Sequence, residues 1–172
     1  VDINGFSADT LIVEEGALLD ASGSRNSIGR AAVINGTLRT SVSAGLDYAI
    51  YMYNNNVTLG PNSTIRFYGG SSQQRFSTRD DYANVEISGP SEKRLNGNVT
   101  VNGTLHLLDS GRVVMFGDDS LVVKKGITGG SATSYISTSG TGTVTINNIG
   151  NSPVIFPVGD RLYSPVTISN AG

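Results

Sequence analysis

The chain has 172 residues, of which 38% are hydrophobic and 15% charged, and 22 are glycine. This length suffices for one domain with a sizeable core, and the glycine-rich, charge-poor composition favours an all-β protein over a helical one. The formal net charge of -2 argues against nucleic acid as the main partner, no apolar run is long enough to cross a bilayer, and the lack of cysteine excludes disulfides and thiol chemistry.

One phrase recurs along the chain, namely a short alternating strand, a corner, a small residue and a second strand. Copies lie at 11–19, 32–39, 57–67, 100–106 and 113–123, and two of them share Asn-Gly-Thr-Leu. The small residues after the corners are separated by 20, 27, 40 and 16 residues, which gives a ragged period of about twenty; these residues are Ala17, Thr37, Thr64, Thr104 and Ser120. The long gap predicts a degenerate copy near 85–89.

A ragged repeat of this size, made of strands and corners, predicts an all-β fold, a right-handed parallel β-helix (β-solenoid) over residues 1–150. Stacked coils hydrogen-bond at about 4.8 Å spacing, with Val, Ile and Leu pointing inward at alternate positions. Glycine, Asn and Asp are expected at corners because they tolerate positive φ or cap their own backbone. The alternative is a sandwich of hairpins, because Asn-Gly is a strong hairpin signal. The recurrence of the corner and the shortness of the strands favour the solenoid.

The middle of the chain departs from the repeat. Residues 47–56 carry three of the seven tyrosines, and the polar, aromatic-containing stretch near 68–82 is predicted to protrude as a loop. Tyrosine rings offer flat contact surface for sugars or proteins. The candidate ligand-binding residues are Tyr51, Tyr53, Tyr68, Asp80 and Asp81. In the plainer interpretation Tyr48, Ile50 and Met52 face the core, while Tyr51 and Tyr53 form an exposed ladder.

The last stretch carries a family resemblance. It reads "NVTVNGTLHL", then "SYISTSGTGTVTINNIGNSPVIFPVGD" and "YSPVTISNAG". From about Val85 to Gly172 this resembles the repeat-rich surface and secreted proteins of Bacteroidota, in which an FPVG…YxPV segment follows the last coils of a β-helix. The resemblance implies export by the type IX route as one module of a larger protein. Residues 151–172 are then terminal strands or a junction to a downstream module that carries the sorting domain.

Little in the sequence points to catalysis or a cofactor. The one histidine, His106, lies at an outward strand position and cannot by itself form a His-based metal site. Asp118-Asp119 and Asp80-Asp81 could contribute oxygen ligands to a structural calcium, but neither pair matches a known calcium loop. Polysaccharide-cleaving enzymes need clustered carboxylates or a positioned base, and no such pattern is present. We therefore expect no catalytic residue, no metal and no cofactor.

Modification is a further expectation. Asp9-Thr10-Leu11 and Asp119-Ser120-Leu121 match the short O-glycosylation pattern that the resemblance implies, which makes Thr10 and Ser120 candidate sites. The Asn-x-Thr triplets coincide with the corner motif and do not indicate eukaryotic glycosylation.

These observations favour a non-catalytic structural or adhesive module, extracellular or at the cell surface. Its expected partners are neighbouring modules of the same polypeptide, and glycans or surfaces, without nucleic acid or membrane insertion. One alternative is a carbohydrate-binding module that uses the Tyr-rich loops, and a weaker one is a polysaccharide-active β-helix enzyme acting through Asp80 or Asp81. An ice-binding face is disfavoured because no regular Thr-x-Thr array recurs.

Overall fold

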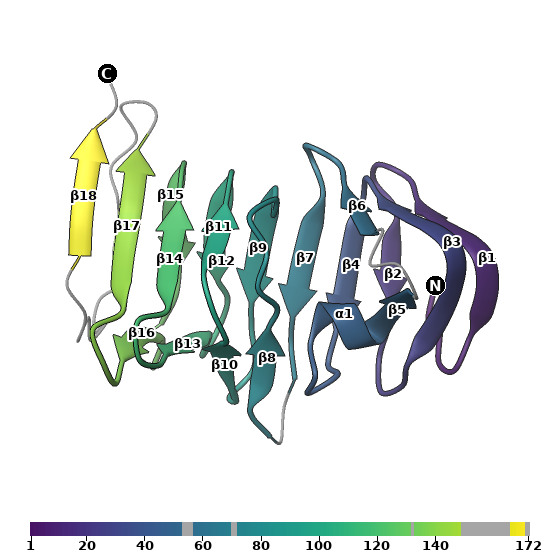
Figure 1. Cartoon of the computed structure of the whole chain (residues 1–172), viewed down its shortest axis with the longest axis horizontal. Helices are drawn as coiled ribbons and strands as arrows, with labels where there is room; N and C mark the ends of the chain where they lie inside the picture. Colours follow the sequence, from purple (N-terminus) through teal and green to yellow (C-terminus); the bar gives the residue numbers. More distant parts are fainter. Residues whose placement is uncertain (53–56, 70–71, 132, 149–165, 171–172) are drawn as a thin grey trace.

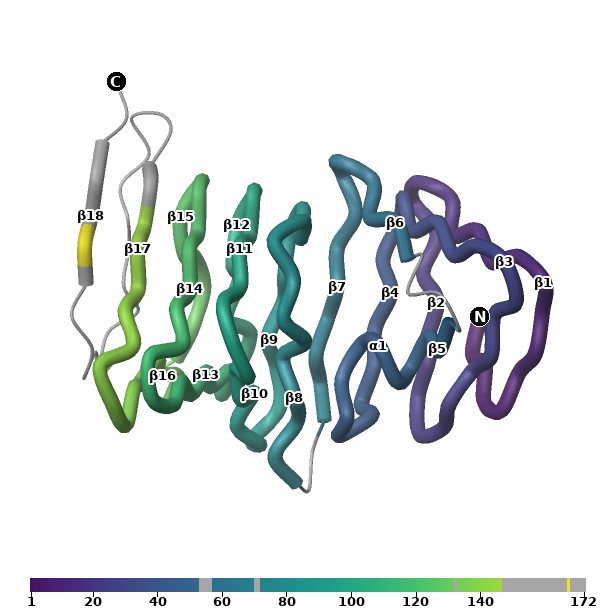
Figure 2. Tube along the Cα trace, in the orientation of Figure 1, coloured from purple at the N-terminus to yellow at the C-terminus, as the bar shows by residue number. Residues whose placement is uncertain are grey.

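The computed structural model describes residues 1–52, 57–69, 72–131, 133–148 and 166–170. They form a β-solenoid whose strand pairs are all parallel (Figures 1 and 2). The strands are β1 Ser7–Val13, β2 Leu18–Asp20, β3 Asn26–Ile34, β4 Thr37–Thr40, β5 Ile50–Met52, β6 Val57–Leu59, β7 Thr64–Phe67, β8 Gln74–Phe76, β9 Asn84–Ile87, β10 Glu92–Leu95, β11 Val99–Val101, β12 Thr104–Leu107, β13 Arg112–Met115, β14 Ser120–Val123, β15 Gly126–Gly129, β16 Tyr135–Thr138, β17 Thr143–Asn148 and β18 Val166–Asn170. One short helix, α1 (Leu46–Ala49), precedes β5.

The strands assemble into four sheets along the solenoid. The longest runs β15-β12-β9-β7-β4-β2, so six successive coils contribute one strand each. The others run β1-β3-β5 with β6 also on β3, β16-β13-β10-β8, and β11-β14-β17-β18. The predicted parallel solenoid is therefore confirmed, and the hairpin alternative is wrong for the described strands.

The core consists of inward rows that continue from coil to coil. In the six-stranded sheet the register aligns one apolar side chain per strand, all of them buried: Leu19, Leu38, Ile65, Val85, Leu105 and Ile127. Strand β9 lies between β7 and β12 and is the degenerate copy that the gap in the repeat predicts. Each added coil thus removes another apolar row from water, which is the main stabilising term of the fold.

Ser120, the last marker of the sequence repeat, does not lie in the row that Thr37, Thr64 and Thr104 share in the six-stranded sheet. Ser120 begins β14, which pairs with β11 and β17 in a different sheet. The position that follows Thr104 in the six-stranded sheet is Gly126. Strands on different faces share the same alternating pattern, so the sequence motif alone does not reveal the face.

The Asn-Gly corners require glycine, but not because of the positive φ that the sequence analysis expects. Gly36 and Gly103 do not have positive φ. Instead, a methyl group at Gly103 would overlap the Ala83 carbonyl oxygen and the Asn84 side chain, and one at Gly36 would overlap backbone oxygens of the preceding corner. Close stacking of one corner on the next, rather than a left-handed backbone, selects glycine here.

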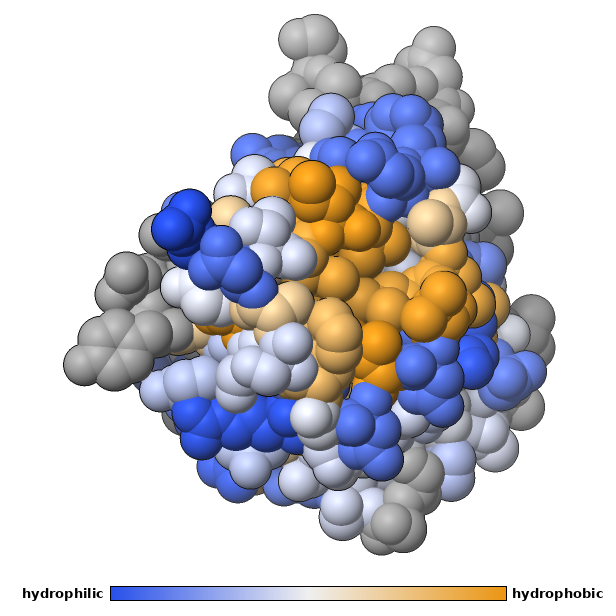
Figure 3. Space-filling model, turned by 90° about the vertical axis from the view of Figure 1, so that its right-hand side faces the viewer, coloured by the Kyte–Doolittle hydropathy of each residue, from blue (hydrophilic) through white to orange (hydrophobic). Residues whose placement is uncertain are grey.

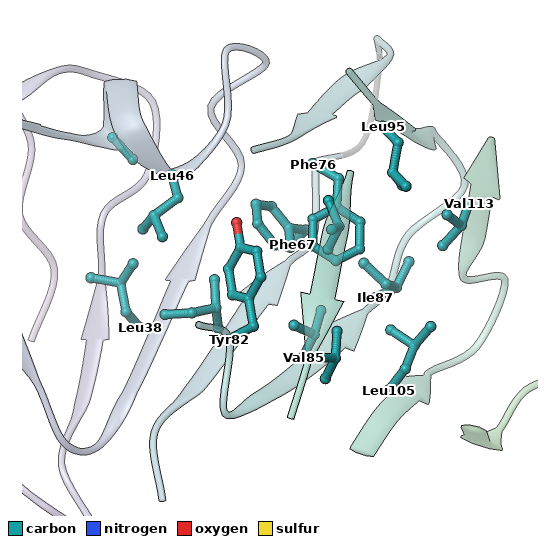
Figure 4. Packing of buried hydrophobic residues seen from close by; sticks show 14 of the residues in the cluster. Leu38, Leu46, Phe67, Phe76, Tyr82, Val85, Ile87, Leu95, Leu105 and Val113 are labelled. Atoms are coloured by element: carbon teal, nitrogen blue, oxygen red, sulfur yellow. The ribbon is translucent and has the colours of Figure 1, made fainter. Parts of the chain in front are cut away.

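The segment 68–82 is not simply a protruding loop. It contains β8, which pairs with β10, and the rings of Phe76 and Tyr82 are fully buried. These rings pack with Phe67 at centroid distances of 5.0 to 6.3 Å in the centre of the core (Figure 4). Polar residues between the aromatics give the segment a loop-like composition, but the aromatic residues themselves supply the inward row.

Candidate functional site

Tyr68, a predicted ligand-binding residue, belongs to a group that ties three coils together. Its hydroxyl donates to Asp20 Oδ1 over 2.7 Å, across 48 residues of sequence. Arg39, from the coil between them, pairs with Asp20 Oδ2 at 2.6 Å, and its guanidinium carbon lies 5.3 Å from the Tyr68 ring centroid. We call this carboxylate, arginine and tyrosine a three-coil clasp.

A second three-coil clasp has the same composition nearer the C-terminus. Glu92 of β10, Arg112 of β13 and Tyr135 of β16 are aligned by the strand register. The Tyr135 hydroxyl donates to Glu92 Oε1 at 2.5 Å, and the Arg112 guanidinium carbon lies 5.5 Å from the ring centroid. Arg112 Nε also donates to the Thr133 carbonyl oxygen at 3.3 Å. In both clasps the tyrosine side chain crosses the intermediate coil, which carries the arginine, and its hydroxyl reaches the carboxylate two coils earlier in the chain.

The environment of both tyrosines favours the neutral phenol. Desolvation by burial, followed by the hydrogen bond to Asp20, raises the pKa of Tyr68. Burial and then the hydrogen bond to Glu92 likewise raise the pKa of Tyr135. Each phenol hydroxyl therefore stays protonated and donates its hydrogen bond to a carboxylate of the same chain. Tyr68 thus fits a role in joining coils better than a role as a sugar-binding surface.

Tyr51 lies in β5 and is also covered by an arginine. The Arg25 guanidinium carbon is 3.3 Å from its ring centroid and 5.9 Å from that of Tyr48. Tyr48 is 45% exposed, so the expectation that it faces the core is wrong, whereas Ile50 and Met52 are buried as expected. The reason is α1, which turns Tyr48 outward. Tyr53 lies outside the described residues.

A shallow groove of about 320 Å³ runs beside Tyr51. Ser7, Asp9, Ser27 and Gly29 line it together with the ring. The pairing of β1 with β3 shifts register between Ala8 and Thr10, and Gly29 carries no side chain, so the surface is hollowed there. Hydroxyl groups, a carboxylate and an aromatic edge are the groups that recognise sugars.

Asp80 and Asp81 do not form a paired acidic site. Both oxygens of Asp81 accept hydrogen bonds from Arg79, each at 2.7 Å, and Arg79 also donates to the Val57 carbonyl oxygen at 2.8 Å. Burial alone would lower the pKa of Arg79, but the Asp81 hydrogen bonds and charge outweigh it and raise that pKa. Asp80 is exposed, and its backbone oxygen accepts from Asn102. This arrangement anchors one coil to the preceding one and does not favour acid–base catalysis.

Asp81 also borders a groove of about 420 Å³ at a corner of the solenoid. The groove lies over Ala83, whose side chain is small. Pro61 of the preceding coil and Asn102 of the following coil also line it. Lys125 contributes the opposite charge. The negative charge of Asp81 and the positive charge of Lys125 therefore cancel within the lining of this groove.

The remaining sequence candidates are separated from these grooves. Thr10 is exposed on β1, and Ser120 is half-buried with its hydroxyl donating to Asn98 Oδ1 at 2.8 Å. His106 lies in the outward row of the six-stranded sheet between Glu86 and Thr128, as predicted. The Asp119 carboxylate accepts from the Phe116 backbone N–H at 3.1 Å, a turn role. O-glycosylation of Thr10 or Ser120 stays a prediction.

Two buried polar side chains have no clear signal in the sequence. Gln74 and Lys93 occupy neighbouring inward positions of β8 and β10, and both are fully buried. Gln74 donates to the Thr40 and Val42 carbonyl oxygens at 2.8 and 3.1 Å. Lys93 Nζ donates to the Gly69 and Ser91 carbonyl oxygens at 3.1 and 2.7 Å. Desolvation, and then the charge of Arg112, lowers the pKa of Lys93 to about 8.

The arginines that cover tyrosines are a second feature that sequence patterns do not single out. Arg25, Arg39 and Arg112 each meet a tyrosine from a following coil. The signal is an outward arginine with a tyrosine one coil later, and it becomes readable only once the coil register is known.

Within the part of the chain that the structure describes, no group of three or more His, Cys, Asp or Glu side chains is placed to hold a metal ion. No helix among the described residues has the length and hydropathy required to traverse a bilayer. Comparison with known proteins gives no match: no family model, no curated protein and no solved structure is significantly similar to this chain.

Proposed function

We propose that this chain is a non-catalytic structural module, a stiff spacer in a larger extracellular or cell-surface protein whose faces make adhesive contacts. The observation that carries the proposal is the pair of three-coil clasps. Each adds a phenol–carboxylate hydrogen bond and an arginine–tyrosine contact across coils that the backbone ladders already join. Bending the solenoid between these coils must disturb ladders, buried rows and clasps together, so the stack resists bending.

A mechanical experiment tests the proposal. The chain is placed between two marker domains of known unfolding force and is pulled through its ends. We expect one cooperative unfolding event, at a force that falls when Tyr68→Phe and Tyr135→Phe are combined. Tyr48→Phe is the matched control, since Tyr48 is exposed and belongs to neither clasp. Coil-by-coil unfolding at a force that the double variant leaves unchanged contradicts the proposal.

A parallel assay addresses catalysis. The chain is incubated with a panel of polysaccharides, and release of reducing or unsaturated ends is measured. We expect no turnover. Turnover that Asp80→Asn or Asp81→Asn abolishes would instead identify an enzyme. Asp80→Asn is the milder change, because Asp81→Asn also weakens the pair with Arg79.

The groove beside Tyr51 favours carbohydrate binding as a second candidate function. Its lining offers Ser7 and Ser27 hydroxyls and the Asp9 carboxylate within one shallow depression. A glycan array followed by calorimetry tests it: Tyr51→Ala and Asp9→Asn should weaken any sugar binding, while Tyr68→Ala should leave it unchanged. Binding that none of these changes affects would exclude this groove.

A further inference from the structure

Two arginines lie next to each other on the outside of the solenoid. Arg75 of β8 and Arg94 of β10 are partners in the strand register, alternate with buried neighbours and are exposed. They lie on the flank of the stack; Figure 3, which looks onto its N-terminal end, shows how hydrophilic residues surround an apolar middle. Like charges on neighbouring strands repel, so this pair is costly unless an anion binds it.

Other outward arginines have a carboxylate partner. Within the described residues, neither Arg75 nor Arg94 forms an ion pair with a carboxylate. The carboxylate on the same strand is that of Glu92, and its two oxygens already accept hydrogen bonds from the Tyr135 hydroxyl and the Gln73 amide. The arginines that do form ion pairs, each with its carboxylate, are Arg30 with Asp9, Arg39 with Asp20, Arg66 with Glu86 and Arg79 with Asp81.

A groove of about 280 Å³ adjoins the two arginines, which form part of its lining. Ser43 of the preceding coil, Gln73 and Asn96 also line it, and all three are exposed. Their hydroxyl and amide groups both donate and accept hydrogen bonds. The groove therefore combines two cations with neutral hydrogen-bonding groups of the kind that bind sugar hydroxyls.

An aromatic ring holds one of the two guanidinium groups. The Arg94 guanidinium carbon lies 4.0 Å from the centroid of the Phe116 ring, in the next coil. The ring covers one face of the group, whereas the N–H donors lie in its plane and point past its edges. These donors form a planar fork that matches two oxygens of an oxyanion. Arg94 is thus positioned for an anion without being consumed by its aromatic contact.

We propose that Arg75 and Arg94 bind a sulfate or carboxylate group of an acidic polysaccharide, whose neighbouring hydroxyl groups reach Ser43, Gln73 and Asn96. An anion between the guanidinium groups replaces their repulsion by charge-assisted hydrogen bonds. This inference names a ligand class for the adhesive contacts, and it rests on the function proposed above.

The small extent of the positive charge favours a polysaccharide over a nucleic acid. In the same outward row Arg94 is followed by Val114 and Ser137, so the charge does not continue along the sheet. A nucleic acid carries a phosphate at every unit and draws its affinity from many cationic contacts, which a chain of net charge -2 does not offer. One anionic group flanked by hydroxyls matches two arginines flanked by neutral polar groups.

The test is calorimetry of the whole chain with a sulfated chondroitin hexasaccharide at low salt. We expect the wild type to bind it, and Arg75→Gln and Arg94→Gln each to weaken binding by about tenfold or more. Asn96→Asp keeps both arginines but adds a carboxylate beside them, so it should also weaken binding. Arg30→Gln is the matched control, because it removes the same charge from an arginine of another sheet whose side chain is 80% exposed. All four positions are exposed, and circular dichroism should show an intact fold.

Comparison ligands identify the chemical class. Neutral maltohexaose and inorganic sulfate should each bind at least about tenfold more weakly than the hexasaccharide, because each supplies only half of the contacts. Inorganic sulfate or a DNA hexanucleotide that binds as tightly as the hexasaccharide overturns the assignment to a polysaccharide. The site itself is overturned if the wild type does not bind, or if Arg30→Gln weakens binding as much as Arg75→Gln. The pulling experiment does not involve these arginines, so failure here leaves the spacer function standing.

Discussion

Lys93 makes the stability of this protein depend on pH in an unusual direction. The side chain is fully buried, and its ammonium group is held by the Gly69 and Ser91 backbone oxygens at 3.1 and 2.7 Å. No carboxylate of the described residues pairs with it, and Arg112 adds a like charge. Burial therefore disfavours the charged form, and the pKa falls from 10.5 to about 8.

The sign follows from proton counting. Between pH 8 and pH 10.5 the unfolded chain binds a proton at Lys93 that the folded protein has largely released, so the free energy of unfolding rises with pH in this window. The full difference corresponds to about 3 kcal/mol, of which about 2.5 kcal/mol is regained between pH 7 and pH 10. Above pH 10 the raised pKa values of Tyr68, Tyr82 and Tyr135 act in the opposite direction.

The assay is urea unfolding, followed by circular dichroism, at intervals from pH 7 to pH 10. The wild type should gain stability over this range, and Lys93→Met should flatten the rise. The slope is the readout rather than the absolute stability, because Met also removes hydrogen bonds to Gly69 and Ser91. Lys125→Met, at an exposed lysine, is the control and should keep the rise. An equal slope in wild type and Lys93→Met refutes the reasoning.

Three further outcomes follow from single contacts. Tyr135→Phe removes the hydrogen bond to Glu92 and should lower the free energy of unfolding by about 1 kcal/mol in chemical denaturation, while Tyr48→Phe should be neutral. Gly103→Ala should lower the free energy of unfolding by roughly 2 kcal/mol or more, because its methyl group overlaps the neighbouring corner. Gly5→Ala should lower it by only about 1 kcal/mol, because Gly5 has a positive φ but open space around it. Thermal unfolding compares the two variants. Arg79→Met should cost roughly 2 kcal/mol by losing the Asp81 and Val57 contacts, and a change within error would show that solvent replaces them.

The features that can be predicted from sequence are those with the period of one coil. Alternation identifies the inward rows, the recurring corner identifies the stacking, and a gap of two periods locates β9. Each of these depends on residues a few positions apart, where side-chain direction follows directly from the strand. The apolar character of Leu38, Val85 and Leu105 is therefore sufficient to predict that these side chains face the core.

The features that cannot be predicted depend on which coil and which face a residue occupies. Ser120 has the same neighbours in sequence as a corner residue of the six-stranded sheet but lies on another face. Tyr68 has the composition of a ligand-binding loop around it, yet its hydroxyl partner is 48 residues away. Tyr48 alternates with buried residues, yet α1 turns it outward. Insertions of unequal length between coils change how many residues separate neighbouring strands. The sequence spacing alone therefore does not show which residue of another coil a given side chain contacts.

The irregular centre of the solenoid shows why polar residues are buried there. Between β4 and β8 the chain makes α1, and there Gln74 gives a second donor to the Thr40 and Val42 carbonyl oxygens, which also accept from the Tyr68 and Gly45 backbone N–H groups. Arg79 likewise donates to the Val57 carbonyl oxygen, and Lys93 donates to that of Gly69, which also accepts from the Ser91 hydroxyl. In each case the donor lies later in the chain than the carbonyl group it satisfies. Side chains from later coils therefore add hydrogen bonds to carbonyl oxygens of earlier ones, and because Lys93 is buried to make these bonds, its pKa is lowered.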